Sequence, residues 1–531
     1  MNSEKLRWWQ DGVVYQIYPR SFADSNGDGI GDLPGILGRL DYVAALGVDA
    51  VWISPIYPSP MADFGYDVAD YCGVDPIFGT LADADRLIAQ AHARGLRLIL
   101  DFVPNHSSDA HPWFRASRTS RTDPQRDWYI WRDPAPGGGP PNNWLSHFGG
   151  SAWEWDAVTG QYYLHSFLRE QPDLNWRNPA VRAAMYDALR FWLDRGIDGF
   201  RVDVMWVLIK DDKFRSNPPN PAHAPDRGSY DALLPLYTAD RPEVHEIVAE
   251  LRDLVDGYGN RVLIGEIYLP VERLMTYYGH DLRGAHLPFN FQLIDAPWSA
   301  AALAAIVRDY EAALPAGAWP NWVLGNHDKA RIASRVGIAQ ARVAAMLLLT
   351  LRGTPTLYYG DELGMTDVPI APDRVADPAE RNQPGIGLGR DPERTPMPWD
   401  ASPGGGFTAG EPWLPLGDHS EVNVAAESVR SDSMLMLYRR LLALRRTHSA
   451  LSRGTLADIR SHGDVLIYER RHARMRLIVV LNLGHAACEV SIGAGQILLS
   501  TFLDRGAEAV SSSLALRASE GVILVGAEPS R

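Results

Sequence analysis

The segment Leu98-Ile99-Leu100-Asp101-Phe102-Val103-Pro104-Asn105-His106 joins a dense apolar run to polar residues at its end. A short run of this kind is typical of a strand buried on both faces of a parallel sheet. Comparable runs occupy residues 13–18, 50–53, 199–202, 261–264, 287–292, 321–324 and 356–359. Together they predict eight strands.

Amphipathic stretches separate several of these runs. Residues 34–46, 81–94, 179–195 and 243–255 carry apolar side chains at helical spacing. A repeated alternation of strand and helix predicts either a closed barrel or a doubly wound sheet. No G-x-G-x-x-G segment follows the first strand and no Walker loop occurs, so we expect an α/β protein built on a (β/α)₈ TIM barrel.

Three segments interrupt the alternation, each after the carboxyl end of a strand. Residues 104–176 are rich in Trp, Pro, Gly and Asn and predict a small inserted domain B, residues 205–240 predict an extended loop, and residues 366–407 predict another. The catalytic barrel would then comprise residues 1–103 and 177–450. Short alternating strands in residues 451–531 predict a C-terminal antiparallel β-sandwich domain.

Composition limits the classes of partner. The 531 residues include 51 Lys and Arg against 65 Asp and Glu, a formal charge of −14, which disfavours nucleic acid and anionic lipid but suits a neutral ligand. No apolar run approaches the ~18 residues of a membrane span. Two distant cysteines, Cys72 and Cys488, form neither a disulfide framework nor a zinc cluster. We therefore expect a cytoplasmic monomer or homodimer without nucleic-acid or membrane partners.

Charged residues recur where the predicted strands end. Asp203 follows the fourth strand, Glu266 the fifth and Asp328 the seventh. In a closed barrel these ends converge on one mouth, where Arg201, His106 and His327 would flank them. A lone carboxylate at a strand end is more often a helix cap or a salt bridge, so the prediction depends on the coincidence of several.

The residue types in this mouth match acetal cleavage. That reaction needs an acid for the leaving oxygen and a carboxylate facing the oxocarbenium ion. A third carboxylate would raise the pKa of the acid by like-charge repulsion, while Arg201 would keep its neighbour ionised.

A separate loop near the N-terminus presents oxygen atoms at alternate positions. The candidate metal ligands are Asp24, Asn26, Asp28, Ile30 and Asp32. The loop is not an EF-hand, because its twelfth position is Gly35. The alternative interpretation is a turn-rich loop held by Asx caps.

Several of these segments resemble the α-amylase family of glycoside hydrolases. Residues 101–106, 199–203, 265–266 and 326–328 are similar to its conserved regions. Residues 9–22, 65–67, 171–176 and 390–399 are similar to its α-glucosidase and oligo-1,6-glucosidase branch. The resemblance extends from about residue 8 to about residue 400.

The resemblance implies roles for individual residues. Asp203 would be the nucleophile that forms a covalent glucosyl intermediate, Glu266 the acid/base, and Asp328 the residue that binds sugar hydroxyls. Asp67 and Arg390 would bind the 4-hydroxyl and so close the pocket beyond the terminal sugar, with Arg394 as the alternative to Arg390. The remaining residues expected to line the pocket are Tyr66, His106, Phe148, Phe167, Gln171, Arg201, Val204 and His327. It also implies a structural Ca²⁺ or Mg²⁺ in the 24–32 loop and no organic cofactor.

The activity implied is that of a retaining, exo-acting α-glucosidase. It would release glucose from the non-reducing end of maltose-type short α-glucosides, or transfer it to acceptor sugars or alcohols. Val204 resembles members that tolerate α-1,6 linkages, whereas the loop at 217–225 resembles bacterial α-glucosidases that prefer maltose-sized substrates, and we expect the α-1,4 preference. The alternatives are an oligo-1,6-glucosidase, a sucrose or trehalulose-type hydrolase, and a non-catalytic amylase-like partner protein.

Overall fold

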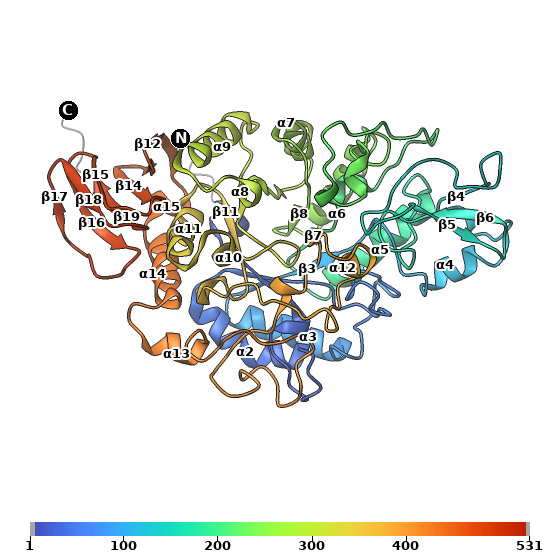
Figure 1. Ribbon diagram of the computed structural model, residues 1–531, viewed down its shortest axis with the longest axis horizontal. Helices are drawn as coiled ribbons and strands as arrows, with labels where there is room; N and C mark the ends of the chain where they lie inside the picture. Colours follow the sequence, from blue (N-terminus) through green and yellow to red (C-terminus); the bar gives the residue numbers. More distant parts are fainter. Residues whose placement is uncertain (1–5, 527–531) are drawn as a thin grey trace.

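Eight parallel strands form the centre of the computed structural model, which describes residues 6–526 (Figure 1). Their order is β10-β11-β1-β2-β3-β7-β8-β9, and a parallel bridge between Asn290 and Trp322 joins β9 to β10, so that the sheet nearly closes on itself. The predicted barrel is confirmed. The strands are β1 Val14–Ile17, β2 Ala50–Ile53, β3 Arg97–Phe102, β7 Gly199–Val202, β8 Val262–Gly265, β9 Leu287–Pro288, β10 Asn321–Val323 and β11 Thr354–Tyr358.

The sixth barrel strand departs from its prediction. β9 ends at Pro288, and residue 292, predicted as its last, instead begins helix α8 (Gln292–Asp295). Asn290 lies between the two elements, and its side-chain oxygen accepts the Gln292 amide at 3.1 Å. This Asx turn ends the strand because it bends the backbone toward the helix.

Helices surround the barrel, and their boundaries follow local capping rules. Helix α2 (Leu33–Leu46) begins at Asp32, whose carboxylate accepts the Gly35 amide, and ends at Gly47 in the left-handed region (φ 102°). The other long helices that cover the barrel are α3 Leu81–Ala93, α5 Pro179–Asp194, α6 Val244–Gly257, α9 Ala300–Ala313, α11 Ile338–Thr350 and α14 Met434–Thr447. The shorter helices are α1 Trp8–Asp11, α7 Val271–Leu274, α10 Ile332–Val336, α13 Val424–Val429 and α15 Ser449–Ser452. None of the helices within residues 6–526 has the length and apolar character needed to cross a membrane.

Domain B leaves the barrel after β3. It contains α4 (Pro112–Ser117) and a three-stranded antiparallel sheet of β4 (Trp131–Arg132), β6 (Gln161–Leu164) and β5 (Trp153–Asp156). Two bridges, His106 to Asp173 and Tyr129 to Leu174, join its outgoing and returning segments. These bridges hold domain B at the carboxyl end of the barrel strands, and its elements α4, β4, β5 and β6 lie at the right in Figure 1.

The two other long segments have little regular structure. Residues 205–240 contain short 3₁₀ turns, and residues 366–407 contain the helix α12 (Pro378–Asn382) and one 3₁₀ turn. Gln383 connects these two segments, because its side-chain oxygen accepts the Ser229 amide at 2.9 Å. Both loops therefore contribute to the same end of the barrel.

The C-terminal domain is antiparallel, as predicted. A six-stranded sheet has the order β12-β13-β14-β19-β16-β17, and a pair, β15 with β18, packs over one of its faces through apolar side chains. The strands are β12 Thr455–His462, β13 Val465–His472, β14 Met475–Asn482, β15 Cys488–Ser491, β16 Gly495–Ser500, β17 Ala509–Val510, β18 Ser513–Leu516 and β19 Gly521–Gly526. The predicted domain limits also include residues 1–5 and 527–531, which lie outside the described residues.

Two buried arginines join this domain and α14 to the barrel. Arg445 donates from Nη1 and Nη2 to the carbonyls of Leu349, Leu351, Leu451 and Gly353, at 2.5 to 3.4 Å. Arg470 on β13 donates to the carbonyls of Thr350 and Gly454. These carbonyls include those at the end of α11, which have no partner within the helix.

We expect Arg445→Met to lower the free energy of unfolding by about 3 kcal/mol, because it leaves several buried carbonyls without donors. Urea denaturation followed by fluorescence would measure the change. The matched control is Arg440→Met, on the exposed side of the same helix. Equal stability of the two variants would contradict this account of the α14 contact.

Candidate active site

A single buried guanidinium organises the mouth of the barrel. Arg201, on β7, has a fully buried side chain. Its Nη1 lies 2.7 Å from Asp101 Oδ1 and 2.8 Å from Asp203 Oδ1, and its Nη2 lies 2.7 Å from Glu266 Oε2. The structure therefore brings two of the predicted catalytic carboxylates together on one cation. Asp101, noted as a strand-end residue but not selected as a site residue, is the third carboxylate.

The strand ends hold Asp203 and Glu266 rigidly. The Asp203 amide donates to the Phe102 carbonyl at 2.8 Å, and the Glu266 amide donates to the Val202 carbonyl at 3.0 Å. Val204 has a positive φ of 38°, which is unusual for a β-branched residue. In this conformation its amide donates to Glu266 Oε2 at 2.8 Å, so the strained residue helps to fix that carboxyl group.

The charges of this cluster favour retention of a proton. Burial raises the pKa of Asp203 well above its ordinary value, although Arg201 opposes the rise. Burial also raises the pKa of Glu266, again against Arg201, and that of Asp101 to about 6. Glu266 and Asp203 each contact a terminal nitrogen of the same guanidinium. One guanidinium cannot balance three ionised carboxylates, so the pair titrates as a coupled unit.

Asp328 belongs to a second cluster with the opposite electrostatic character. Its Oδ1 lies 2.6 Å from Arg394 Nη2 and 3.2 Å from Arg390 Nη1. Burial alone would raise the pKa of Asp328, but the guanidiniums of Arg390 and Arg394 hold it well below its ordinary value. The prediction posed Arg390 and Arg394 as alternatives, whereas the structure brings both to the same carboxylate oxygen.

The carboxylate that meets Arg390 is Asp63 rather than Asp67. Asp63 Oδ1 lies 2.7 Å from Arg390 Nη2, and Asp377 Oδ2 lies 2.6 Å from its Nε. Asp67 lies behind Asp63 and accepts the amides of Ala62 and Asp63, and burial raises its pKa to about 6. Asp63 and Asp377 were missed because a contact between residues far apart in the chain leaves no local sequence signal.

His327 and Tyr66 connect the two clusters. The Tyr66 hydroxyl lies 2.5 Å from His327 Nε2 and donates to Asp101 Oδ2 at 3.0 Å. Gln16 on β1 lies 2.8 Å from His327 Nδ1 through its amide nitrogen. Burial lowers the pKa of His327 well below its ordinary value, so the ring is neutral. Gln16 was not predicted.

The remaining predicted residues form the wall on the side of domain B. Gln171 Nε2 contacts Asp63 at 3.2 Å and His106 at 3.1 Å. The Phe167 ring centroid lies 5.1 Å from that of His106, and the Phe148 ring lies 5.0 Å from the Arg390 guanidinium carbon. All ten predicted substrate-binding residues thus lie in or beside one pair of connected clusters.

A stack of rings joins this wall to the loop after β7. His147 stacks on Phe167 at 4.7 Å and on Tyr230 at 3.6 Å, measured between ring centroids. His147 and Phe167 belong to domain B, whereas Tyr230 belongs to the 205–240 loop. The wall of the site is therefore made by two separate segments in contact.

The 24–32 loop is held by its own side chains. Asp24, Asn26 and Asp28 each accept a backbone amide two residues ahead, and Asp32 caps α2. The predicted ligands are all oxygen atoms, as Ca²⁺ and Mg²⁺ require, and a carboxylate that accepts one amide keeps further lone pairs for a cation. Within residues 6–526, no three His, Cys, Asp or Glu side chains gather at one point as metal ligands. The metal site stays a prediction.

Comparison with known proteins agrees with the fold. The family model described as "Alpha amylase, catalytic domain" matches residues 16–454, and the chain belongs to this family of glycoside hydrolases. A probable alpha-glucosidase of Rhizobium meliloti is 43% identical over 498 residues, which are 90% of each chain. An oligo-1,6-glucosidase of Parageobacillus thermoglucosidasius is 41% identical over 516 residues, again 90% of each chain.

Solved structures give the same result in three dimensions. An alpha-glucosyl transfer enzyme superposes with a TM-score of 0.93 at 41% identity, over 98% of this chain and all of the other. A trehalulose synthase of Pseudomonas mesoacidophila superposes with a TM-score of 0.90 at 37% identity over the same shares.

We expect a chelator to lower the melting temperature, because an ion bound only to the native state stabilises it. Calorimetry with EDTA, followed by excess Ca²⁺ or Mg²⁺, would measure the effect. Asp28→Ala should abolish the response, whereas Asp400→Ala, which removes an exposed Asx turn elsewhere, should retain it. An unchanged melting temperature in EDTA would refute the metal site.

Proposed function

We propose that this protein is a retaining, exo-acting α-glucosidase that releases or transfers glucose from the non-reducing end of maltose-type α-glucosides. The observation that carries the proposal is the contact of Asp203 and Glu266 with the two terminal nitrogens of Arg201. Two carboxyls on the terminal nitrogens of one guanidinium suit double displacement, for which a separation of about 5–5.5 Å is expected, rather than inversion, which needs a gap of about 6.5–9.5 Å for a water molecule.

Each carboxyl group has a distinct role in the proposed reaction. An oxygen of Asp203 attacks the anomeric carbon while Glu266 donates its proton to the glycosidic oxygen, which leaves with the rest of the substrate. Glu266 then removes a proton from water or from an acceptor hydroxyl, whose oxygen displaces Asp203. Burial raises the pKa of both carboxyls against Arg201, so the coupled pair retains a proton, which the reaction requires on Glu266.

The second cluster supports an exo-acting mode. Asp328 is held ionised by Arg390 and Arg394 and can accept hydrogen bonds from sugar hydroxyls. Arg390, its carboxylate partner Asp63 and the Phe148 ring would form the closed end of the pocket against the terminal glucose. Asp67 would act there by fixing Asp63.

The preference for α-1,4 substrates is the less constrained part of the proposal, because relatives carry both alpha-glucosidase and oligo-1,6-glucosidase names. A panel of maltose, isomaltose, sucrose and trehalose, with product chromatography, separates these substrate preferences.

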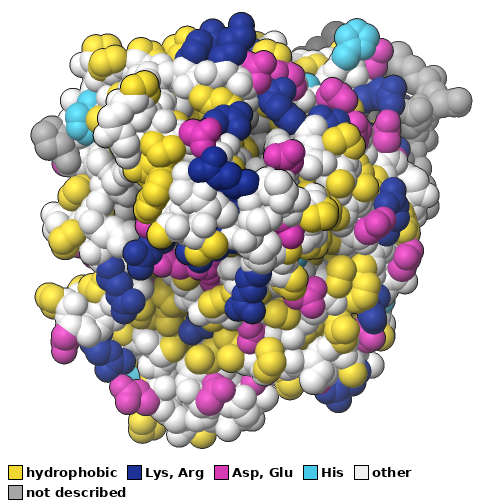
Figure 2. All heavy atoms as spheres, turned by 90° about the vertical axis from the view of Figure 1, so that its right-hand side faces the viewer, with side chains coloured by type: hydrophobic (Ala, Val, Ile, Leu, Met, Phe, Trp, Pro, Cys, Tyr) yellow, Lys and Arg dark blue, Asp and Glu magenta, His cyan; other side chains and the backbone are white. Residues whose placement is uncertain are grey.

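Surface charge and cysteine state bear on the setting in which the enzyme would act. On the face shown in Figure 2, acidic and basic side chains are interspersed, which suits a neutral substrate. A cytoplasmic location is part of the proposal, since Cys72 and Cys488 are free thiols.

Proton NMR of the first product formed tests the reaction class. Retention predicts that α-glucose appears before mutarotation, whereas β-glucose as the first product would exclude the proposed mechanism.

Asp203→Ala should lower kcat by about 10⁴-fold or more, and Glu266→Gln should lower it by about 10²–10⁴-fold on maltose. Both residues act on the reacting atoms, so circular dichroism should show an unchanged fold. Asp418→Ala, at an exposed Asx turn, provides the control. Near-normal turnover by either catalytic variant would end the assignment.

The pH dependence of kcat/KM should be bell-shaped. Glu266 acts in its protonated form, and its pKa is raised, so activity should persist above the ordinary range of a glutamate pKa and fall as pH rises further. Asp203 acts ionised, so activity should also fall as pH drops through the lower apparent pKa of the coupled pair. In Glu266→Gln, assayed with 4-nitrophenyl α-glucoside, the alkaline limb should disappear, and its persistence would assign that limb to another group.

A further inference from the structure

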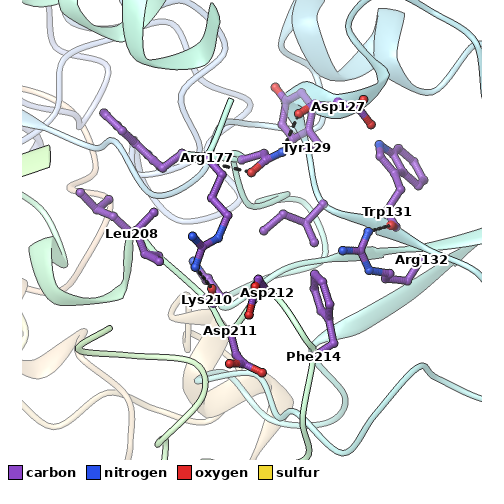
Figure 3. A pocket seen from close by; sticks show the side chains of 14 residues that line it. Asp127, Tyr129, Trp131, Arg132, Arg177, Leu208, Lys210, Asp211, Asp212 and Phe214 are labelled. Atoms are coloured by element: carbon purple, nitrogen blue, oxygen red, sulfur yellow. Dashed lines mark hydrogen bonds between the residues drawn. The ribbon is translucent and has the colours of Figure 1, made fainter. Parts of the chain in front are cut away.

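Lys210 is a buried cation that the proposed reaction does not use. It follows the 3₁₀ turn Met205–Val207 in the loop after β7, and its side chain is 2% exposed. The Arg177 guanidinium donates to the backbone carbonyl of Lys210 at 2.9 Å, and Figure 3 shows both residues. Inside, Lys210 Nζ lies 2.6 Å from Asp173 Oδ2 and 2.6 Å from Asn105 Oδ1.

The ammonium group determines how the Asn105 amide is oriented. An ammonium donates hydrogen bonds but cannot accept one, so only the oxygen of Asn105 can face it. Asn105 Nδ2 must then face the other way, where it lies 3.1 Å from His106 Nδ1 and 3.3 Å from Asp173 Oδ1. If the Asn105 amide were reversed, its Nδ2 would face the Lys210 ammonium, and both groups are donors.

The orientation of Asn105 in turn selects the tautomer of His106. Because Asn105 Nδ2 is a donor, His106 Nδ1 has to accept, which places the ring proton on Nε2. His106 Nε2 lies 3.0 Å from the Tyr66 carbonyl, which can only accept and favours the same tautomer, and 3.1 Å from Gln171 Nε2, a donor that favours the opposite one. Because these two contacts oppose each other at Nε2, the Asn105 contact at Nδ1 decides the tautomer. Burial lowers the pKa of His106 to about 4, so the ring is neutral at working pH and its tautomer is what matters.

We propose that Lys210 is a positioning residue: through Asn105 it holds His106 in the tautomer that carries its proton on Nε2. Lys210 belongs to the loop after β7, whereas Asn105 and His106 follow β3. The contact therefore transmits the position of the 205–240 loop to a residue of the glucose pocket without touching substrate.

The consequence for catalysis rests on the proposed function. Only a proton on His106 Nε2 can hold the Tyr66 carbonyl, and the Tyr66 side chain contacts Asp101 and His327 in the site. The wrong tautomer would weaken binding of substrate and transition state alike. It should therefore raise KM by about two- to tenfold, with a smaller change in kcat.

The direct test is ¹⁵N NMR of the full chain with labelled histidine, since the two ring nitrogens resonate differently according to which carries the proton. His106→Gln assigns the signal. Wild-type protein should show the proton on Nε2. Asn105→Asp should move it to Nδ1, because a carboxylate can accept from both Lys210 and His106, and Lys210→Met should give a mixture of tautomers.

Asp173→Asn provides the matched control. It removes the buried ion pair but keeps Lys210 on Asn105, so the tautomer should remain on Nε2 even if stability falls. Should Lys210→Met fail to fold, Asn105→Asp still decides the question. The proposal is overturned if His106 stays protonated on Nε2 in Asn105→Asp, or if Asp173→Asn disturbs the tautomer as Lys210→Met does.

The NMR readout needs no substrate, so failure of the proposed activity would leave it unaffected. With maltose as substrate, an unchanged KM in Asn105→Asp despite a moved proton would contradict only the catalytic consequence and reduce Lys210 to a determinant of ring state.

Discussion

The burial of one positive charge among three carboxyl groups is the constraint on which the site depends. Arg201 cannot reach water, so it must be neutralised by Asp101, Asp203 and Glu266, and these can meet it only if the ends of β3, β7 and β8 converge. The barrel supplies that convergence. The same arrangement leaves the carboxyls in excess over the cation, which keeps a proton available where an acid is required.

The two clusters of the site differ in how many cations each carboxylate contacts, and the difference separates their tasks. Around Arg201 three carboxyls share one guanidinium, and burial raises their pKa values. Asp328 contacts two guanidiniums, Arg390 and Arg394, and its pKa falls. A proton is thus held on one side of the pocket and excluded from the other, through neighbours that lie far apart in the sequence.

The sequence predicted the barrel, domain B and the strand-end carboxylates because each leaves a local signal, an apolar run followed by a charged residue. It also predicted Arg201 beside these carboxylates, but not the carboxylates that bind Arg390. Asp63 and Arg390 are separated by 327 residues, and nothing in either segment indicates the pair.

The arginine contacts that join the C-terminal domain to the barrel bear on how the chain is made. Strand β11 ends at Tyr358, so all eight barrel strands have left the ribosome well before Arg445 and Arg470 are synthesised. Until then the carbonyls at the end of α11 have no donors. A nascent barrel would hold α11 loosely until α14 and β13 have been synthesised and can supply Arg445 and Arg470. Truncation before α14 would accordingly leave a chain that has all eight barrel strands but is open to proteolysis at α11.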